Sequence, residues 1–420
     1  MTVVDQDAGS SAAVDVRRGG LPGPIAFLSS MKLSVVLLVL LAILTFLGTL
    51  AQKDQGLYFV QKEYFESWFV FPRLFGFLVL PLPGAVPVLA LLFLNLLVGG
   101  LVRLRWSARN FGILVTHCGI ALLLLSGFVK LSMSDAGHMF LYEGETGSRI
   151  ISPHDWELAL MRQDGDEVVE RVVPGDVLEA AVGGRRVRLP GEGLPFSVEV
   201  HHFLPHCRPT RVGPRFEPRA PVVDGVFLGA APQFIWAASD REMQLPGCYV
   251  TVVDSAGGDS RQAILWADDR LGGGRDLQPF TFESGGQTWG LELRHKTWNS
   301  PFSLRLDRFK KTDHPGTMTP RDYSSWVTVL EPEKQPRPVH IYMNEPLRKD
   351  GLIFFQSNWG PQPPRSGPPW YSVFEVARNP SDQWPLWASL VILAGLVIHF
   401  GAKLLKYIGR ESRRREVEGA

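Results

Sequence analysis

GAVPVLALLFLNLLVGGLV (residues 84–102), RLRWSARN (103–110) and FGILVTHCGIALLLLSGFV (111–129) are two apolar legs joined by a short basic turn. A helix needs about 20 residues to cross the hydrocarbon core of a bilayer, and each leg is close to that length. Neither leg contains Asp, Glu, Lys or Arg. The turn carries Arg103, Arg105 and Arg109, so the positive-inside bias places it in the cytoplasm. The whole stretch predicts a membrane hairpin.

The composition excludes several classes of function. The 420 residues carry a formal net charge of +1, and no Lys/Arg-rich block resembles a phosphate-tracking groove, so nothing points to nucleic acid. None of the three cysteines, Cys118, Cys207 and Cys248, belongs to a CxxC motif. This excludes thioredoxin-like redox chemistry, a zinc ribbon and a covalent haem attachment site. Cys207 and Cys248 are able to pair only if their region lies outside the cell.

Two further apolar runs predict spans on either side of the hairpin. LSVVLLVLLAILTFLGTL (33–50) follows residues 1–30, which lack the apolar core of a cleavable signal peptide and are expected to form a cytoplasmic tail. Residues 385–406, beginning PLWASLVILAGLVIHFGAKLL, predict the last span, and the basic tail 407–420 keeps its end in the cytoplasm. The expected fold is an integral membrane protein with four transmembrane helices.

Residues 31–131 hold the first three of these helices, and an aromatic-rich segment at about 55–83 lies between the first two. Its aromatic residues suit the headgroup zone, so we expect a helix lying on the outer surface. The alternative is a fifth span around Phe65–Leu82. Arg73 within that run and the charge pattern of the flanking segments argue against it.

Residues 132–384 have a different sequence pattern, in which short β-prone runs alternate with turns rich in Gly, Pro, Asp and Asn. Examples are WELALM (156–161), FSVEVHHFL (196–204), CYVTVVD (248–254) and LIFFQSNW (352–359). This spacing predicts an antiparallel sandwich or a barrel-like sheet, with GGRR, DSAGGDS and LGGGRD as hairpin tips. We therefore expect a large β-rich extracytoplasmic domain between the third and fourth spans, with one core or two.

Two histidines lie within the predicted spans. His117 is the only acidic or basic residue in the hairpin legs, and it lies roughly 9 Å from the cytoplasmic entry at Phe111. His399 precedes the cytoplasmic end of the last span by about six residues, so both imidazoles are expected at a similar depth. An ionisable side chain in a span is costly and is usually functional. The spacing leaves two accounts open, namely axial ligation of a haem iron and a buried ring that hydrogen-bonds the backbone.

The β-rich region contains one dense run of metal-ligand residue types, HHFLPHC, which holds His201, His202, His206 and Cys207. Adjacent residues of a strand point to opposite faces, so we expect an ordinary strand followed by a proline loop. The sequence shows no Ser/His/Asp or Cys/His constellation and no phosphate-binding loop. We therefore expect no catalytic residue and no metal ligation beyond haem iron.

Five stretches along the chain are similar, in order, to segments of one known family. They are SSMKLSVVLLVLLAILTFLGTLAQ (29–52), ESWFVF (66–71) with the hairpin that follows, HPGTMTPRDYSSWVTVLEP (314–332), YMNEPLRKDGLIFFQSNW (342–359) and FEVARNPSDQWPLWASLVILAGL (374–396). The chain resembles the ResB (CcsB) family of cytochrome c biogenesis proteins. The resemblance runs from about Ser29 to Leu405 and agrees with the four-span topology.

The resemblance implies a subunit of the System II cytochrome c synthase. With its partner ResC (CcsA), the family is known for handling haem b across the membrane and presenting it to the CxxCH segment of apocytochrome c, and thiol-reducing proteins are further expected partners. His117 matches the family's membrane histidine, which is implicated as an axial haem ligand. His399 has no family counterpart and rests on geometry alone. The tryptophan-rich WWD segment belongs to the partner, so this chain is expected to be inactive alone.

Two other classes of function remain open. One is a non-catalytic membrane scaffold or chaperone that recruits apocytochrome c while the partner alone binds haem. The other is a membrane-anchored sensor whose β domain binds a ligand. Co-purification of haem with the isolated chain would distinguish the synthase subunit from the scaffold, because only the synthase subunit is expected to bind haem. In every case we expect a multi-pass protein of the cell membrane with its large domain outside.

Overall fold

The computed structural model describes residues 23–418 except residues 75–77, 103–106, 108–109, 166, 190, 192, 215–217, 219, 231–244, 256–257, 268–278, 318 and 362–368. Within them the chain forms two compact units. The helical unit draws on Met1–Gln52, Tyr58–Ser132 and Ser381–Ala420, and the β unit on Lys53–Leu57 and Met133–Pro380. The N-terminal tail, most of the arginine turn and the LGGGRD segment lie outside the described residues.

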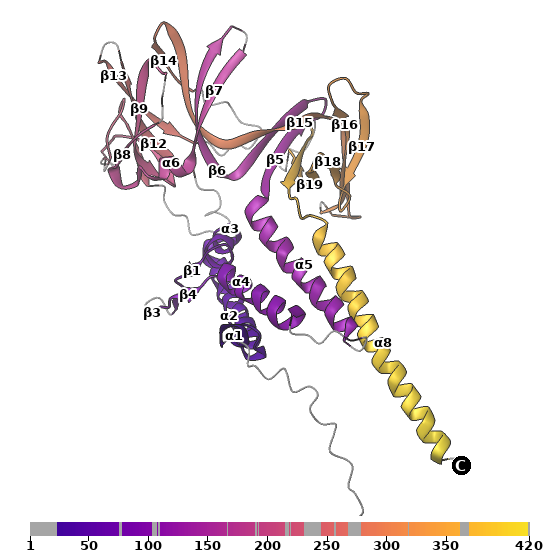
Figure 1. Cartoon of the computed structure of the whole chain (residues 1–420). Helices are drawn as coiled ribbons and strands as arrows, with labels where there is room; N and C mark the ends of the chain where they lie inside the picture. The colour runs from indigo at the N-terminus through magenta and orange to yellow at the C-terminus, as the bar shows by residue number, and fades with distance from the viewer. Residues whose placement is uncertain are drawn as a thin grey trace, which may run out of the picture. The chain divides into compact units, whose positions relative to one another are not determined.

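Three helices are long and apolar enough to cross a membrane: α2 (Met31–Gln55), α5 (Phe111–Met133) and α8 (Trp384–Glu418). The β unit lies between α5 and α8 in the chain, as expected for a membrane protein with an inserted β domain. α8 continues past the expected boundary at residue 406 to Glu418, so the basic tail is helical where it is described. Figure 1 shows α5 and α8 side by side.

The first leg of the hairpin is shorter and less regular than expected. It consists of α4 (Ala85–Asn95, 11 residues) followed by the π-helix η2 (Leu96–Val102, 7 residues). At the α-helical rise of 1.5 Å, a leg of this length spans at most about 27 Å, slightly less than a typical hydrocarbon core. The fourth span therefore stays a prediction.

The segment 55–83 does not form the expected interfacial helix. It begins with α3 (Leu57–Val60) and the π-helix η1 (Gln61–Phe65) and then forms two short strand pairs. These pair β1 (Phe69–Val70) with β4 (Leu82–Pro83), and β2 (Arg73–Leu74) with β3 (Leu78–Val79). Proline lacks the N–H that a helix needs, and prolines at 72, 81 and 83 interrupt this run. The described part of the segment contains no helix long enough for a fifth span.

Asn95 joins the start of the helical unit to the hairpin. The helical conformation is interrupted between α1 (Gly23–Leu28) and α2, which leaves the Leu28 carbonyl at the end of α1 without a partner in that helix. The Asn95 side-chain amide donates to the Leu28 oxygen at 2.6 Å and to the Ser30 oxygen at 3.1 Å, and its own oxygen accepts from Ser34 Oγ at 2.7 Å. The buried Asn95 amide therefore uses both its nitrogen and its oxygen in hydrogen bonds at this interruption. These bonds are needed because the core of a bilayer contains no water to pair with exposed backbone groups.

The β unit is an antiparallel assembly in which β6 and β15 are much longer than the other strands. Its elements are β5 (Asp135–Tyr142), β6 (Thr146–Asp164), β7 (Glu167–Pro174), α6 (Gly175–Glu179), η3 (Val182–Gly184), β8 (Arg186–Arg188), β9 (Phe196–Leu204), β10 (Cys207–Arg211), β11 (Val226–Ala230), β12 (Gly247–Asp254), β13 (Ser260–Trp266), β14 (Phe280–Ser284), β15 (Gln287–Asp313), β16 (Pro320–Leu330), β17 (Arg337–Tyr342), β18 (Leu347–Lys349), β19 (Leu352–Gly360) and β20 (Tyr371–Arg378). All pairings between these strands are antiparallel, so the expected sheet class is confirmed.

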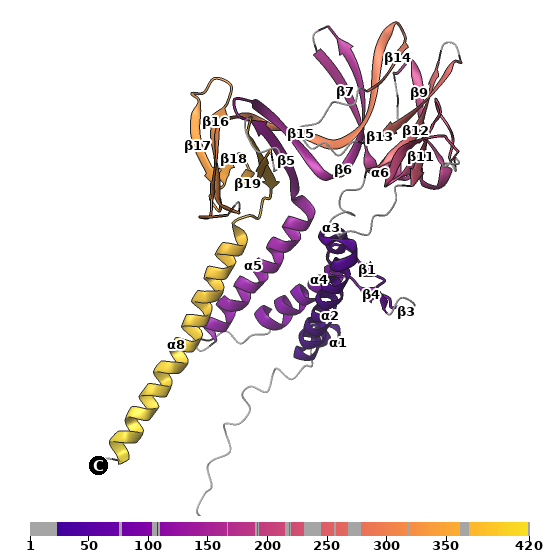
Figure 2. The same cartoon turned by 180° about the vertical axis from the view of Figure 1, so that it is seen from behind.

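Two lobes share β6 and β15, which pair from Trp289–Arg162 at one end to Arg305–Thr146 at the other. In lobe one, parts of β6 and β15 with β7 and β14 face the four-stranded sheet β13-β12-β9-β8. In lobe two, β15 continues through β16 to β17, and β6 continues through β5 to β20, β19 and β18. Figure 2 shows β15 running from one lobe to the other. Register shifts after His295 and after Asn299 accommodate the change of direction.

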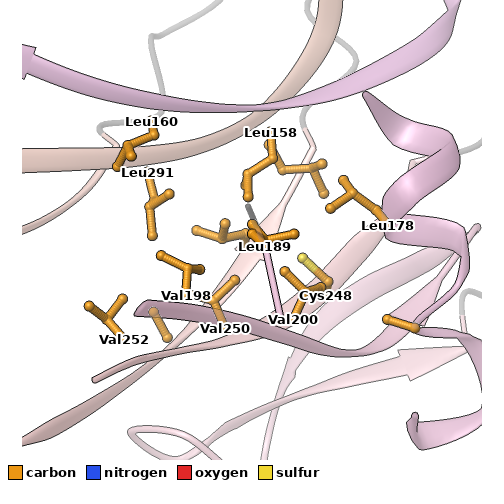
Figure 3. Close-up of a cluster of buried hydrophobic side chains, with 14 of the residues drawn as sticks. Leu158, Leu160, Leu178, Leu189, Val198, Val200, Cys248, Val250, Val252 and Leu291 are labelled. Carbon is orange, nitrogen blue, oxygen red and sulfur yellow. The ribbon is translucent and has the colours of Figure 1, made fainter. Parts of the chain in front are cut away.

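Each lobe has its own hydrophobic core. Figure 3 shows the core of lobe one, where leucines of β6, β15 and α6 meet valines of β9 and β12. The core of lobe two is a separate cluster that includes Met139, Ile150, Leu304 and Phe354. At the start of β9, buried Phe196, Val198 and Val200 alternate with half-buried polar residues, so one face of this part of the strand lies in the core.

Candidate functional site

His117 is the seventh residue of α5 and is half-buried. Its Nδ1 lies 2.7 Å from the carbonyl oxygen of Ile113, one turn earlier in the helix. Because a carbonyl only accepts hydrogen bonds, Nδ1 carries the proton, and in the neutral ring Nε2 then holds a lone pair. Among the residues that the structure describes, Nε2 has no hydrogen-bond partner. The ring is therefore held in the tautomer that a metal ion needs for ligation through Nε2.

The other edge of the His117 ring lies against η2. A Cβ atom added to Gly100 would stand 2.7 Å from Cδ2 and 3.3 Å from Cγ of His117. The first distance is shorter than real Cβ contacts and the second is tight, so the ring occupies space that a side chain at position 100 would need. π-helical turns inside apolar helices occur often at functional sites. The imidazole is thus enclosed between α5 and a π-helical turn.

α5 and α8 pack backbone to backbone through small residues. A Cβ atom on Gly112 would lie 2.6 Å from the backbone nitrogen of His399, and one on Gly395 would lie 2.5 Å from that of Thr116. In the same way, a Cβ atom on Gly119 would lie 3.0 Å from the backbone oxygen of Ala388. Small residues one or two turns apart let membrane helices approach closely. We call Gly112, Thr116, Gly119, Ala388 and Gly395 the glycine seam.

His399 is not placed beside His117 by this packing. The backbone of His399 stands at Gly112, five residues before His117 and so roughly 7 Å away along the helix axis. His117 also points about 100° away from Thr116 around α5, toward η2 rather than toward α8. The ring of His399 contacts Phe400. No contact among the described residues joins the two imidazoles, and their roles as haem ligands stay predictions.

Comparison with protein families matches part of the β unit. Residues 281–367 match the sequence model of the ResB-like family. This segment is a ResB-like domain. It runs from β14 to residue 367 and includes two of the five stretches quoted above, 314–332 and 342–359. Membership of the family implies a role in cytochrome c biogenesis. A search of curated proteins finds no match to the chain.

The ResB-like domain contains a histidine that the sequence did not single out. His295, on β15, is 8% exposed and stacks on Trp156 of β6 with ring centroids 3.7 Å apart. Both of its ring nitrogens are buried without a hydrogen-bond partner. Burial lowers the pKa of His295 to about 4, and the ring is therefore neutral near pH 7. Only the three-dimensional pairing of β6 and β15 reveals this environment.

Before the ResB-like domain, the HHFLPHC run differs from the expected strand. His202 has a positive φ of 50°, and β12 shifts register beside it. The alternation of faces is therefore broken, and the Nδ1 atoms of His201 and His202 lie 2.9 Å apart instead of pointing to opposite faces. His206 accepts a hydrogen bond from the Leu245 backbone. Within the described residues, no group of three or more His, Cys, Asp or Glu side chains is placed to hold a metal ion.

Cys207, on β10, and Cys248, on β12, are free thiols on strands of two different sheets. Cys248 belongs to the core of lobe one, and Cys207 packs with Tyr249 and Leu228 in a separate cluster. Since Cys248 and Tyr249 are consecutive on β12, their side chains leave opposite faces. Burial raises the pKa of each thiol to about 12, which keeps both protonated and unreactive. The pairing that the sequence left open does not occur in this structure.

Proposed function

We propose that this chain is the haem-holding subunit of a System II cytochrome c synthase. The observation that carries the proposal is the geometry of His117. It combines an apolar helix, an Nδ1–H group that donates a hydrogen bond to the Ile113 carbonyl, and an Nε2 without a hydrogen-bond partner among the described residues. Haem is the cargo, and its iron takes neutral imidazole as an axial ligand. A hydrogen bond from Nδ1 to a carbonyl orients such a ligand and raises its basicity.

The proposal includes four spans with both termini in the cytoplasm and the β unit outside the cell membrane. The arginine turn then places the start of α5 near the cytoplasm, and His117 is roughly 9 Å from that end. This depth suits capture of haem from the cytoplasmic side. The ResC (CcsA) partner supplies the outer haem-handling site and the attachment chemistry.

The β unit receives apocytochrome c in this proposal. Among the strands that the structure describes, β17 ends the large sheet and β7 pairs only with β6, so each has one edge without a strand partner. An extended CxxCH segment, kept reduced by a thiol-reducing protein, is able to pair with such an edge through backbone hydrogen bonds. The match of residues 281–367 to the ResB-like family supports this assignment of the unit to cytochrome c biogenesis.

The test replaces His117 with Ala in the chain purified together with its partner. We expect at least a tenfold loss of haem per complex and a corresponding loss of cytochrome c maturation, since the axial ligand is gone. Added imidazole should restore part of the haem spectrum by occupying the vacated position. Cys118→Ala is the matched control, because Cys118 is the next residue of α5 and is exposed.

A normal haem spectrum and full maturation in His117→Ala would show that the ligand assignment is wrong. His399→Ala, measured in the same way, then tests the second candidate ligand. If both histidines are dispensable, the chain acts as a scaffold that recruits apocytochrome c while the partner alone binds haem.

A further inference from the structure

We infer that Gly100 is a positioning residue, which aims Nε2 of His117 at the haem iron. This inference rests on the function proposed above and adds to it a residue on a different helix. Gly100 belongs to η2, in the first leg of the hairpin, and His117 belongs to α5, in the second. The two legs meet at this contact.

The His117 ring is held on both of its flanks. Nδ1 and Cδ2 are the two ring atoms bonded to Cγ, so contacts to both determine the rotation of the ring about the Cβ–Cγ bond. Nδ1 is held by the carbonyl of Ile113 at 2.7 Å. Cδ2 faces Gly100, where an added Cβ would come within 2.7 Å, so the ring keeps this position only while residue 100 has no side chain. Nε2 is bonded to Cδ2, so its direction follows from these two contacts.

The two glycines of η2 have different partners. A Cβ atom on Gly99 would face the carbonyl oxygen of Ser29 at 3.2 Å, whereas one on Gly100 would face His117 at 2.7 Å and Leu96 Cδ1 at 3.1 Å. Leu96 has a flexible branch that is able to move aside. The imidazole is tied to Ile113 and has less freedom. Gly100 is therefore specific for His117, and Gly99 is a matched control within the same turn.

A methyl group at position 100 has a defined consequence. The ring must rotate or withdraw, and either movement lengthens the Nδ1–H hydrogen bond to Ile113 and redirects Nε2. Loss of the partner that orients a metal-binding histidine typically weakens metal affinity about 10- to 100-fold. We therefore expect Gly100→Ala to lose haem affinity about tenfold or more while His117 itself is still present.

The first measurement does not involve haem. The full chain contains ten histidines, and 15N-histidine labelling of the protein in liposomes reports the protonation of each ring by solid-state NMR. The His117 signals are identified by their absence in His117→Ala. In the wild-type chain Nδ1 should be protonated and Nε2 bare. In Gly100→Ala the His117 signals should shift, whereas they should stay in place in Gly99→Ala and in Gly127→Ala, where a Cβ meets nothing within 4 Å.

The second measurement is haem binding by the complex with its partner. Gly100→Ala should show a haem affinity reduced about tenfold and an altered spectrum, and Gly99→Ala and Gly127→Ala should bind haem normally. The inference is overturned if Gly100→Ala leaves the His117 signals unchanged, or if Gly99→Ala disturbs them equally. His117→Ala tests the proposed function separately, because a complex that keeps its haem without His117 contradicts that function whatever the NMR signals show.

Discussion

His295 is buried in a way that makes the β unit sensitive to acid. The ring lies between the Trp156 ring and neighbouring strands, and His138, His154 and Asp155 are the titratable groups that act on it. His138 also has a lowered pKa, again through burial. Protonation of His295 in the folded state is unfavourable because burial keeps water away from the charged ring.

Stability should therefore fall as the pH falls. An exposed histidine in the unfolded chain takes up a proton near pH 6.5, whereas folded His295 resists until about pH 4, so the unfolded state binds more protons between these values. The free energy of unfolding contributed by His295 is fully present above about pH 6.5 and is lost as the pH drops to about 4. The expected loss is about 3 kcal/mol.

His295→Phe provides the measurement. Phenylalanine keeps the stack on Trp156 but does not titrate, so the variant should lose less stability than the wild type between pH 7 and pH 4. Pulse proteolysis of the full chain in nanodiscs gives the unfolding free energy of the β unit at each pH. Equal pH dependence in both proteins would show that His295 does not control acid sensitivity.

At the scale of elements, the glycine seam determines how α5 and α8 meet. The contacts at Gly112 are to backbone atoms of α8, which have no freedom to move aside, and those at Gly119 include backbone atoms of Ile392 and Ala388 beside the Ile392 side chain. Ser381 Oγ adds a hydrogen bond of 2.9 Å to the Ser126 carbonyl at the other end of the pair. The two helices are therefore antiparallel neighbours whose separation depends on the absence of side chains.

Gly112→Ala should separate α5 from α8. Its Cβ atom would stand 2.6 Å from a backbone nitrogen, and overpacking of this kind costs about 1–3 kcal/mol. Gly401→Ala, on α8 with nothing within 4 Å, should be neutral or slightly stabilising, since alanine favours helices. Disulfide cross-linking between Ser126→Cys and Ser381→Cys measures the pairing. A cross-linking yield in Gly112→Ala equal to that of Gly401→Ala would contradict the proposed role of the seam.

At the scale of the whole molecule, the arrangement in the membrane is the main untested property. α2, α5 and α8 are the long apolar helices, and the β unit follows α5. If α4 with η2 also crosses, the arginine turn and both termini lie in the cytoplasm and the β unit lies outside. A hairpin leg that failed to cross would place the ends of the chain on opposite sides.

Reporter fusions distinguish these arrangements. Fusions after Asp54, Ser107, Ser260 and Ala420 should report outside, inside, outside and inside, because the positive-inside bias applies to the arginine turn and to the basic end of α8. A cytoplasmic signal after Ser260 would contradict the topology and with it the capture of haem by His117 from the cytoplasmic side.

Much of this protein follows from local pattern alone. Runs of about 20 apolar residues require helices in a bilayer, so the positions of α2, α5 and α8 are determined by composition. Alternating apolar and polar residues likewise predict strands such as β9, and short apolar runs predict others such as β19, because their buried faces require apolar side chains. Family likeness pointed to ResB, and the match of residues 281–367 agrees with it.

Other features depend on contacts between residues far apart in the chain. The segment 55–83 forms strand pairs rather than a helix, and β6 and β15 join two lobes, because backbone pairing depends on partners that a local pattern does not specify. The tautomer of His117 is local, since Ile113 lies one turn away. Three other features depend on tertiary structure, because each requires two separate segments to approach within van der Waals distance. They are the contact of His117 with Gly100, the packing of His399 against Gly112, and the burial of His295.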